Sequence, residues 1–344
     1  MMDKREFAAY ILLHLEEALD SSVYGPDTLV SIAEVHKAGG RKMTGLTVRK
    51  PGENIIPCIY LDEYHREYLE GRPLAEILEA IAAQDAGLRG NVDVPELREE
   101  DLSFESVCDA IYIQACDTER SREYLKGVPH METGDISAIY RIRIAETDDI
   151  VQSVEISNPM LEMWGVSLDE LHETALANHM EYRQTVMYSM EELIGYRIPE
   201  MEEPADLLEG THPIPSPQIS VGKPMYVLTN REQTHGAACI FDKETMARVA
   251  AKLGGNFFLL PSSVHEILAV PDDGQIDYRE LSETVYDINR TIVEPREFLS
   301  DKVQYYDRQQ KKILGKQEYL ELQKEQILQT GEEGPEAGHA APRM

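Results

Sequence analysis

The stretch that decides the fold is KPMYVLTN-REQTHGAACIFD-KETMARVAAKLGG-NFFLLPSSVHEILAVPDD, residues 223–273. MYVLTN and GAACIFD are short apolar runs of the kind that form paired strands, and so are NFFLL and VHEILAV. Between these two pairs, Asp242 is a favoured helix N-cap residue and Gly254 is a typical helix stop. The stretch therefore predicts a hairpin, a helix and a second hairpin, in that order.

The same order of hairpin and helix recurs on the N-terminal side of this stretch. Residues 45–50 (GLTVRK) and 54–61 (NIIPCIYL) predict one hairpin around a Pro-Gly turn. Residues 135–144 (DISAIYRIRI) and 150–156 (IVQSVEI) predict another around an acidic turn at 146–149. Hairpins give antiparallel pairing, and amphipathic helices bury one face against a sheet. We therefore predict an α+β fold of repeated hairpin–helix units, mainly antiparallel sheet covered by helices.

Apolar residues at helical spacing predict helices over residues 4–19 and 104–115, and a charged helical C-terminal arm over 298–328. Tyr306, Ile313, Leu320 and Ile327 recur every seven residues in this arm. A seam of one position per heptad is a poor coiled coil, so docking on the protein's own body is favoured over dimerisation. Six segments follow from these shifts in composition: an N-terminal α+β region (1–128), a second hairpin–helix region (129–198), a Pro-rich acidic linker (199–224), a C-terminal α+β region (225–298), the charged helical arm (299–329) and a disordered tail (330–344).

The composition is that of a globular protein. The 344 residues are 42% hydrophobic, yet no apolar run approaches the roughly 18 residues that span a bilayer. The N-terminus carries acids directly after its apolar residues, unlike a signal peptide, so we expect a protein of the bacterial-type cytoplasm without membrane contact. The four cysteines form no CxxC pair, which favours reduced thiols over disulfides or structural zinc.

The formal net charge of −30 bears on the choice of partner. Phosphate backbones need clustered Lys and Arg, so we expect no direct nucleic-acid binding. An acidic surface is suited to a basic protein partner, although the same charge also serves solubility alone. The oligomeric state is not set by any feature of the sequence.

Motifs for cofactors and metals fail on inspection. The chain has no glycine-rich phosphate loop, no GxGxxG and no GxSxG. His172 and His179 are seven residues apart, about 10 Å along a helix, which is too far for one zinc ion. Residues 273–280 match the second half of a calcium-binding loop, but Ala269 and Pro271 stand where ligands are needed. We therefore expect neither a cofactor nor a metal.

One compact set of residues combines nucleophile, base and acid types. Ser263 and His265 alternate along a predicted strand, so they share a face. His235 and Asp242, together with Thr229 and Asn230, approach them if the two hairpins pair. Ser263, His265, His235 and Asp242 are therefore the candidate catalytic residues. The competing interpretation places the serine in a hairpin turn and His265 half-buried beside the sheet.

The strings LTNREQTHGAACIF (228–241) and LGGNFFLLPSSVHEILAVPDD (253–273) resemble the bacterial family catalogued as domain of unknown function 5688. Three further segments fit the same pattern: PCIYLDEYHREYLEG, SREYLKGVPHMETGDISAIYRI and ISNPMLEMWGVSLDELHETALAN. The resemblance spans nearly the whole chain to about residue 306, and it implies no activity and no catalytic residues. Such proteins look like cargo of mobile elements in gut bacteria.

Two functional hypotheses follow. The first is a non-enzymatic binding or regulatory protein, in its specific form an acidic inhibitor of a basic partner encoded by a mobile element. The second is a hydrolase or transferase with its site around Ser263 and His265. A carboxylate within hydrogen-bond reach of His265 in a cleft favours the second hypothesis.

Overall fold

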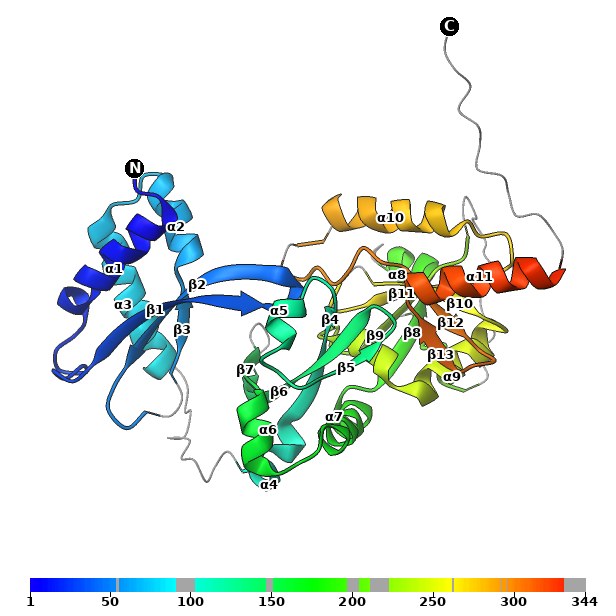
Figure 1. Cartoon of the computed structure of the whole chain (residues 1–344), viewed down its shortest axis with the longest axis horizontal. Coiled ribbons are helices and arrows are strands. Elements are labelled where there is room, and N and C mark those ends of the chain that lie inside the picture. The colour runs from blue at the N-terminus through cyan, green and yellow to red at the C-terminus, as the bar shows by residue number, and fades with distance from the viewer. Residues whose placement is uncertain are drawn as a thin grey trace, which may run out of the picture. The chain divides into compact units, whose positions relative to one another are not determined.

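The computed structural model describes residues 1–53, 56–90, 103–146, 151–196, 204–210, 223–261, 263–291, 293–294 and 296–330 (Figure 1). Helices and antiparallel sheets occur together throughout these residues, which confirms the predicted α+β class. Most of the predicted linker (199–224) and all of the tail after residue 330 lie outside the described residues, as do the turn residues 147–149.

The chain divides into two compact units. Unit 1 comprises residues 1–112, 120–130 and 140–178, and unit 2 comprises residues 113–119, 131–139 and 179–344. Each unit thus takes residues from more than one of the segments predicted from the sequence.

Unit 1 begins with helix α1 (Lys4–Ala18), which packs on a three-stranded antiparallel sheet in the order β1-β2-β3. The elements are β1 (Leu29–Lys37), the 3₁₀ turn η1 (Ala38–Gly40), β2 (Arg41–Arg49), β3 (Cys58–Tyr60), α2 (Leu61–Leu69) and α3 (Leu74–Gly90). The predicted pairing of residues 45–50 with 54–61 is confirmed where β2 meets β3, with Leu46 opposite Ile59. Strand β1 was not predicted, although it pairs with β2 over nine residues.

A buried ionic network closes this part of unit 1. Asp85 of α3 is fully buried and accepts a hydrogen bond from the Tyr24 hydroxyl at 2.6 Å. Arg89, one turn later, donates from Nε to the same Asp85 oxygen at 2.6 Å and also reaches Glu53 and the Val48 carbonyl. Because each charge has its partner, the network ties α3 to the end of β2.

The predicted helix over residues 104–115 is wrong beyond its first turns. Helix α4 (Phe104–Val107) and the 3₁₀ turn η3 (Cys108–Ala110) lead into strand β4 (Ile111–Asp117). Six of the seven β4 residues are buried, on both faces, and its first residues IYI are β-branched and aromatic. An element that is apolar on both sides favours a buried strand, and this overrides the helical spacing of Ile111 and Ala115.

Strand β4 belongs to a four-stranded sheet with the order β4-β6-β5, in which β7 also pairs with β6. The predicted second hairpin is confirmed as β6 paired antiparallel with β7, with a register shift between Arg143 and Ala145. The remaining elements of this region are α5 (Arg122–Leu125), β5 (His130–Thr133), β6 (Ile136–Glu146), β7 (Val151–Glu155), α6 (Asn158–Trp164) and α7 (Leu168–Tyr182).

Unit 2 is built on a six-stranded sheet with the order β13-β12-β10-β11-β9-β8, in which all neighbours are antiparallel. Its strands are β8 (Thr185–Ser189), β9 (Tyr226–Asn230), β10 (Phe257–Leu260), β11 (Ile267–Pro271), β12 (Gln304–Asp307) and β13 (Lys312–Leu314). Its helices are α8 (Met190–Tyr196), the 3₁₀ helix η4 (Gly236–Phe241), α9 (Lys243–Leu253), α10 (Tyr278–Thr291) and α11 (Lys316–Thr330). An aromatic cluster of Phe258, Tyr278, Tyr305 and Tyr319 joins α10 and α11 to the sheet.

The hairpin of β10 with β11 is confirmed, but two other predictions in unit 2 are wrong. GAACIFD does not form a strand; residues 236–241 form η4, whose residues are all buried, and β9 pairs with β8 and β11 instead. The C-terminal helix begins only at Lys316, because the residues before it form β12 and β13. The seven-residue spacing of Tyr306 and Ile313 therefore does not reflect a helix, because the two residues face each other as partners in the antiparallel pair of β12 and β13.

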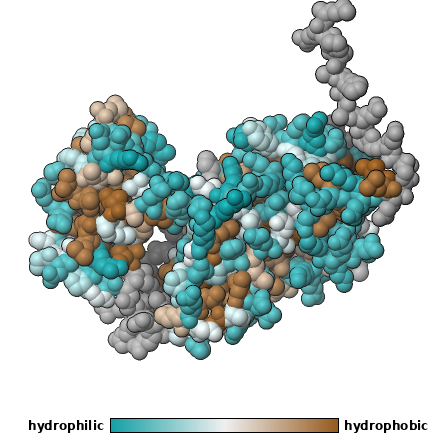
Figure 2. All heavy atoms as spheres, in the orientation of Figure 1, coloured by the Kyte–Doolittle hydropathy of each residue, from teal (hydrophilic) through white to brown (hydrophobic). Residues whose placement is uncertain are grey.

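Hydrophilic side chains cover most of the face drawn in Figure 2, with hydrophobic patches among them on both units. In the described part of the chain, no helix has the length and apolar character needed to cross a membrane.

Candidate functional site

The loop after β9, residues 231–236, has an unusual backbone. Gln233 and His235 have φ values of 51° and 54°, the left-handed region that residues other than glycine rarely adopt. Gly236 follows them, and a Cβ at this position would lie 2.5 Å from both the His265 carbonyl oxygen and the Thr229 hydroxyl. The loop is therefore folded tightly against β9 and the start of β11.

Side chains from the neighbouring elements hold this loop in place. The Asn230 amide donates to the Thr234 carbonyl at 2.8 Å, and its oxygen accepts from the Thr234 N–H at 3.1 Å. The Arg183 guanidinium donates to the same Thr234 carbonyl at 2.9 Å. These three hydrogen bonds on Thr234 help to offset the conformational cost of the two left-handed residues.

His235 and His265 meet because β9 and β11 pair. The His235 backbone N–H donates to Nδ1 of His265 at 3.2 Å, and the two ring centroids are 5.6 Å apart. Nδ1 must be unprotonated to accept this bond, so His265 is neutral with its proton on Nε2. Burial lowers the pKa of His265; Glu297 opposes this effect and Arg296 adds to it.

Ser263 lies beside His265, but its hydroxyl serves the backbone. Its Oγ accepts a hydrogen bond from the His265 N–H at 3.0 Å, and its own backbone forms a bridge to Phe298. The Thr229 hydroxyl donates to the His265 carbonyl at 2.8 Å. The structure thus brings together Thr229, His235, Ser263 and His265 through the pairing of β9 with β11, although the predicted hairpin of residues 225–242 does not form.

Asp242 occupies a different position. It caps α9 by accepting from the N–H groups of Glu244 at 3.0 Å and Thr245 at 3.2 Å, and it also accepts from the Thr245 hydroxyl. The histidine that feels its charge is His179, whose pKa burial lowers to about 4. The carboxylate that acts on His265 is Glu297, so Asp242 does not complete a triad with His265.

Cys239 lies close to Asp242 in the interior of unit 2. Burial raises the pKa of this fully buried thiol to about 12, and the Asp242 charge adds to the effect. A thiol with so high a pKa is not a nucleophile at neutral pH. It packs as a small apolar side chain, as expected for a reduced structural cysteine.

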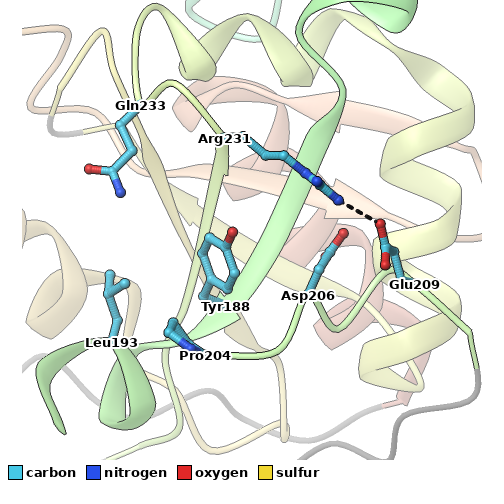
Figure 3. A pocket seen from close by; sticks show the side chains of 7 residues that line it. All are labelled: Tyr188, Leu193, Pro204, Asp206, Glu209, Arg231 and Gln233. Carbon is cyan, nitrogen blue, oxygen red and sulfur yellow. Dashed lines mark hydrogen bonds and ion pairs between the residues drawn. The ribbon is translucent and has the colours of Figure 1, made fainter. Parts of the chain in front are cut away.

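Arg231 and Gln233 of the same loop also line a pocket of about 360 Å³ (Figure 3). The side chains that line it come from β8, α8, the segment 204–210 and the loop after β9: Tyr188, Leu193, Pro204, Asp206, Glu209, Arg231 and Gln233. Sequence reasoning missed this pocket, because its residues are distributed over about 45 positions and carry no motif. Gln233 belongs to both features, because it has a left-handed backbone in the strained loop and its side chain lines the pocket.

The segment 204–210 forms one wall of the pocket along β8. Oδ1 of Asp206 accepts from the N–H groups of Met187 and Leu208, each at 2.9 Å, and the Leu207 N–H donates to the Met187 carbonyl at 2.8 Å. Glu209 and Arg231, which both line the pocket, form an ion pair at 2.9 Å (Figure 3). Two carboxylates, one guanidinium, a phenol and an amide therefore surround the cavity, a lining suited to a small polar or cationic group.

The motifs that resembled metal sites have local structural roles. Asp272, Asp273 and Asp277 accept hydrogen bonds from the backbone N–H groups of Gly274, Gln275 and Arg279, two residues after each of them. Nδ1 of His172 lies 2.9 Å from the Tyr140 hydroxyl in unit 1, whereas His179 is buried in unit 2. In the residues that the structure covers, no group of three His, Cys, Asp or Glu side chains could hold a metal ion.

Comparison with known proteins gives one match. A family model described as a family of unknown function (DUF5688) matches residues 4–308, which is most of the chain. No curated protein and no solved structure matches the chain. The match extends from α1 through the pocket and the strained loop to the end of β12, and it confirms the resemblance seen in the sequence. The chain therefore belongs to this family of unknown function, DUF5688.

Proposed function

We propose that this protein is a non-enzymatic binding or regulatory protein of the bacterial cytoplasm that engages a basic protein partner. The observation that carries the proposal is the pocket of unit 2, where Asp206 and Glu209 present carboxylates next to Tyr188 and Gln233. A partner's lysine or arginine side chain fits a cavity of about 360 Å³ with this lining. The net charge of −30 adds long-range attraction for a basic protein and raises the rate of encounter.

The geometry of the two carboxylates supports recognition of a cation. Asp206 is held in place by the two backbone N–H groups that it accepts from, so it loses little freedom on binding. Glu209 already binds a guanidinium, that of Arg231, and both side chains are more than half exposed. An exposed ion pair is worth at most about 1 kcal/mol, so a partner's cation can replace or share it at low cost.

The candidate catalytic residues also favour binding over catalysis. The Ser263 hydroxyl and the Nδ1 atom of His265 both accept hydrogen bonds from the backbone. A nucleophile needs a base that takes its proton, and these two acceptors face N–H groups instead. Hydrolase or transferase chemistry at Ser263 and His265 stays the alternative, and it requires both bonds to open when substrate binds.

The test is retention of a partner by the purified protein with and without the pocket carboxylates. Asp206→Asn with Glu209→Gln removes two charges and keeps the shape of both side chains. Glu283→Gln with Asp287→Asn, on the exposed face of α10, is the matched control with the same change in net charge. We expect the wild type and the control to retain the same basic protein in low salt, and the pocket variant to lose it.

Two results would contradict the proposal. One is equal retention of that protein by the pocket variant, which would place binding elsewhere. The other is Ser263-dependent labelling of the protein by a fluorophosphonate probe, abolished by Ser263→Ala, which would favour the hydrolase alternative.

A further inference from the structure

The ribbon of β1 and β2 in unit 1 differs in charge from the rest of the chain. Residues 29–49 contain four basic residues (Lys37, Arg41, Lys42 and Arg49) and one acid, Glu34, which gives +3, whereas the whole chain carries −30. The two strands pair over nine residues without a bulge, and the turn η1 joins them. The ribbon is drawn in blue in Figure 1.

The tip of this ribbon rests on a second basic segment of unit 1. The Gly39 N–H donates to the Ser121 hydroxyl at 2.9 Å. Gly40 has a φ of 73°, and a Cβ there would lie 2.7 Å from the Arg120 carbonyl oxygen. Gly40 is therefore needed for this close approach, which brings the basic ends of β1 and β2 next to residues 120–126.

The second segment raises the local charge further. Residues 120–126 contain Arg120, Arg122 and Lys126 with one acid, Glu123, which gives +2. Arg49 is opposite Leu29 at the other end of the ribbon, so the tip itself, residues 34–42, also contributes +2 and the two segments together carry +4. The pKa of the Glu123 carboxyl is lowered, first by its hydrogen bond to Lys126 and further by the charges of His36 and Arg122.

The basic groups of this surface are accessible. Arg41, Lys42, Arg120, Arg122 and Lys126 are all exposed. Glu34 neutralises part of the charge by pairing with Lys42 at 3.2 Å, and Glu123 pairs with Lys126 at 2.6 Å.

We propose that this surface, formed by the tip of the β1–β2 ribbon and residues 120–126, binds the phosphate backbone of a nucleic acid. Three of its exposed cations are arginines, whose planar guanidinium groups match phosphate oxygens in pairs. Acids farther than the Debye length, about 8 Å in physiological salt, repel a bound strand only weakly. The proposal thus departs from the expectation based on the net charge of the whole chain.

The test is the fluorescence anisotropy of a labelled 20-nucleotide single strand, and of the duplex of the same length, titrated with the full-length protein at several salt concentrations. Arg41→Ala with Arg122→Ala should weaken binding at least tenfold at low salt. The slope of log affinity against log salt should fall by about 0.7 for each lost single-strand contact. Arg41→Lys with Arg122→Lys should keep most of that slope, since it keeps the charge.

Controls separate this proposal from general charge effects and from the pocket. Arg279→Ala with Lys324→Ala changes the net charge equally at exposed positions of α10 and α11 and should bind as the wild type does. The pocket variant Asp206→Asn with Glu209→Gln should also bind the oligonucleotide normally, so the two proposals fail independently. Three results overturn the inference: no binding of either oligonucleotide in 50 mM salt, an equal loss in the Arg279/Lys324 variant, or equal competition by a 20-residue poly-glutamate.

Discussion

The backbone N–H of His235 donates a hydrogen bond to Nδ1 of His265 at a distance of 3.2 Å. This bond joins the loop after β9 to the residues that precede β11 in the sheet of unit 2. One hydrogen bond thus fixes the tautomer of an imidazole and also supports a backbone with a positive φ. We expect the ¹⁵N spectrum of His265 at neutral pH to show a protonated Nε2 and an unprotonated Nδ1. A protonated Nδ1 at neutral pH would contradict this geometry. The pKa measured in the same titration should lie below the ordinary value for histidine, because the ring is partly buried.

The close approach at Gly236 should make this glycine irreplaceable. Gly236→Ala places a methyl group 2.5 Å from the His265 carbonyl and 2.8 Å from Cα of Thr229, so β9 or β11 has to move. We expect a loss of about 1–3 kcal/mol in the free energy of unfolding, measured with urea. Gly255→Ala is the control, because no heavy atom lies within 4 Å of a Cβ there and its φ is not positive. An equal loss at both positions would show that the packing around Gly236 is looser than described.

Asp242 is expected to act on stability through the cap of α9. Asp242→Ala removes the acceptor of the Glu244 and Thr245 N–H groups and should cost about 0.5–2 kcal/mol. Asp242→Asn keeps an acceptor oxygen and should cost clearly less. If the asparagine variant is as unstable as the alanine variant, the charge of Asp242 contributes more to the free energy of unfolding than its capping hydrogen bonds do. The interaction of this charge with His179 would then be the explanation to test.

His179 should make unit 2 sensitive to acid. Its pKa is about 4 in the folded protein and about 6.5 when unfolded, so the unfolded chain binds more protons between these values. Its contribution to stability is therefore complete above pH 6.5 and is lost as the pH falls towards 4, by about 3 kcal/mol in all. Urea unfolding of the wild type and of His179→Gln at pH 7 and pH 4.5 measures this, and the variant should lose less stability on acidification. Identical pH dependence in the two proteins would contradict the burial of a neutral imidazole.

The buried network of unit 1 provides a separate stability test. Asp85→Ala leaves the Arg89 guanidinium, which is 12% exposed, without its main partner and should cost about 3–5 kcal/mol. The double substitution Asp85→Leu with Arg89→Leu removes both charges and should cost less than Asp85→Ala alone. If the double variant is less stable than Asp85→Ala, the Asp85–Arg89 ion pair must itself stabilise unit 1. Its role would then be more than to avoid an unpaired buried charge.

The sequence allowed some elements to be predicted and not others, for reasons visible in particular residues. The β6–β7 and β10–β11 hairpins were found because each joins two apolar runs across a short polar turn. Strand β1 was missed because it is an edge strand with a mixed pattern of exposure, in which Ala33 and Glu34 interrupt the apolar alternation. Segment 236–241 was read as a strand because a short, fully buried apolar run has no period that separates a strand from a helical turn.

The candidate site was predictable only in part. The proximity of His235 to His265 was expected only if the two predicted hairpins paired. It arises from the pairing of β9 with β11, although the first of those hairpins does not form. The left-handed conformations of Gln233 and His235 were not predictable, since neither is a glycine and the hydrogen bonds that enforce them come from Asn230 and Arg183. Arg183 is about 50 residues away from this loop, so only the tertiary structure reveals its role.

The course of the chain through the two units has a practical consequence for dissecting the protein. The chain passes from one unit to the other five times, at residues 112, 119, 130, 139 and 178. No single cleavage point therefore yields two complete units, and a gene fragment that encodes the whole of one unit also encodes pieces of the other. Truncations within residues 113–139 would also separate strand β4 from its neighbour β6, and would report on misfolding instead of activity. Point substitutions in the intact protein are the appropriate tool for assigning its two surfaces.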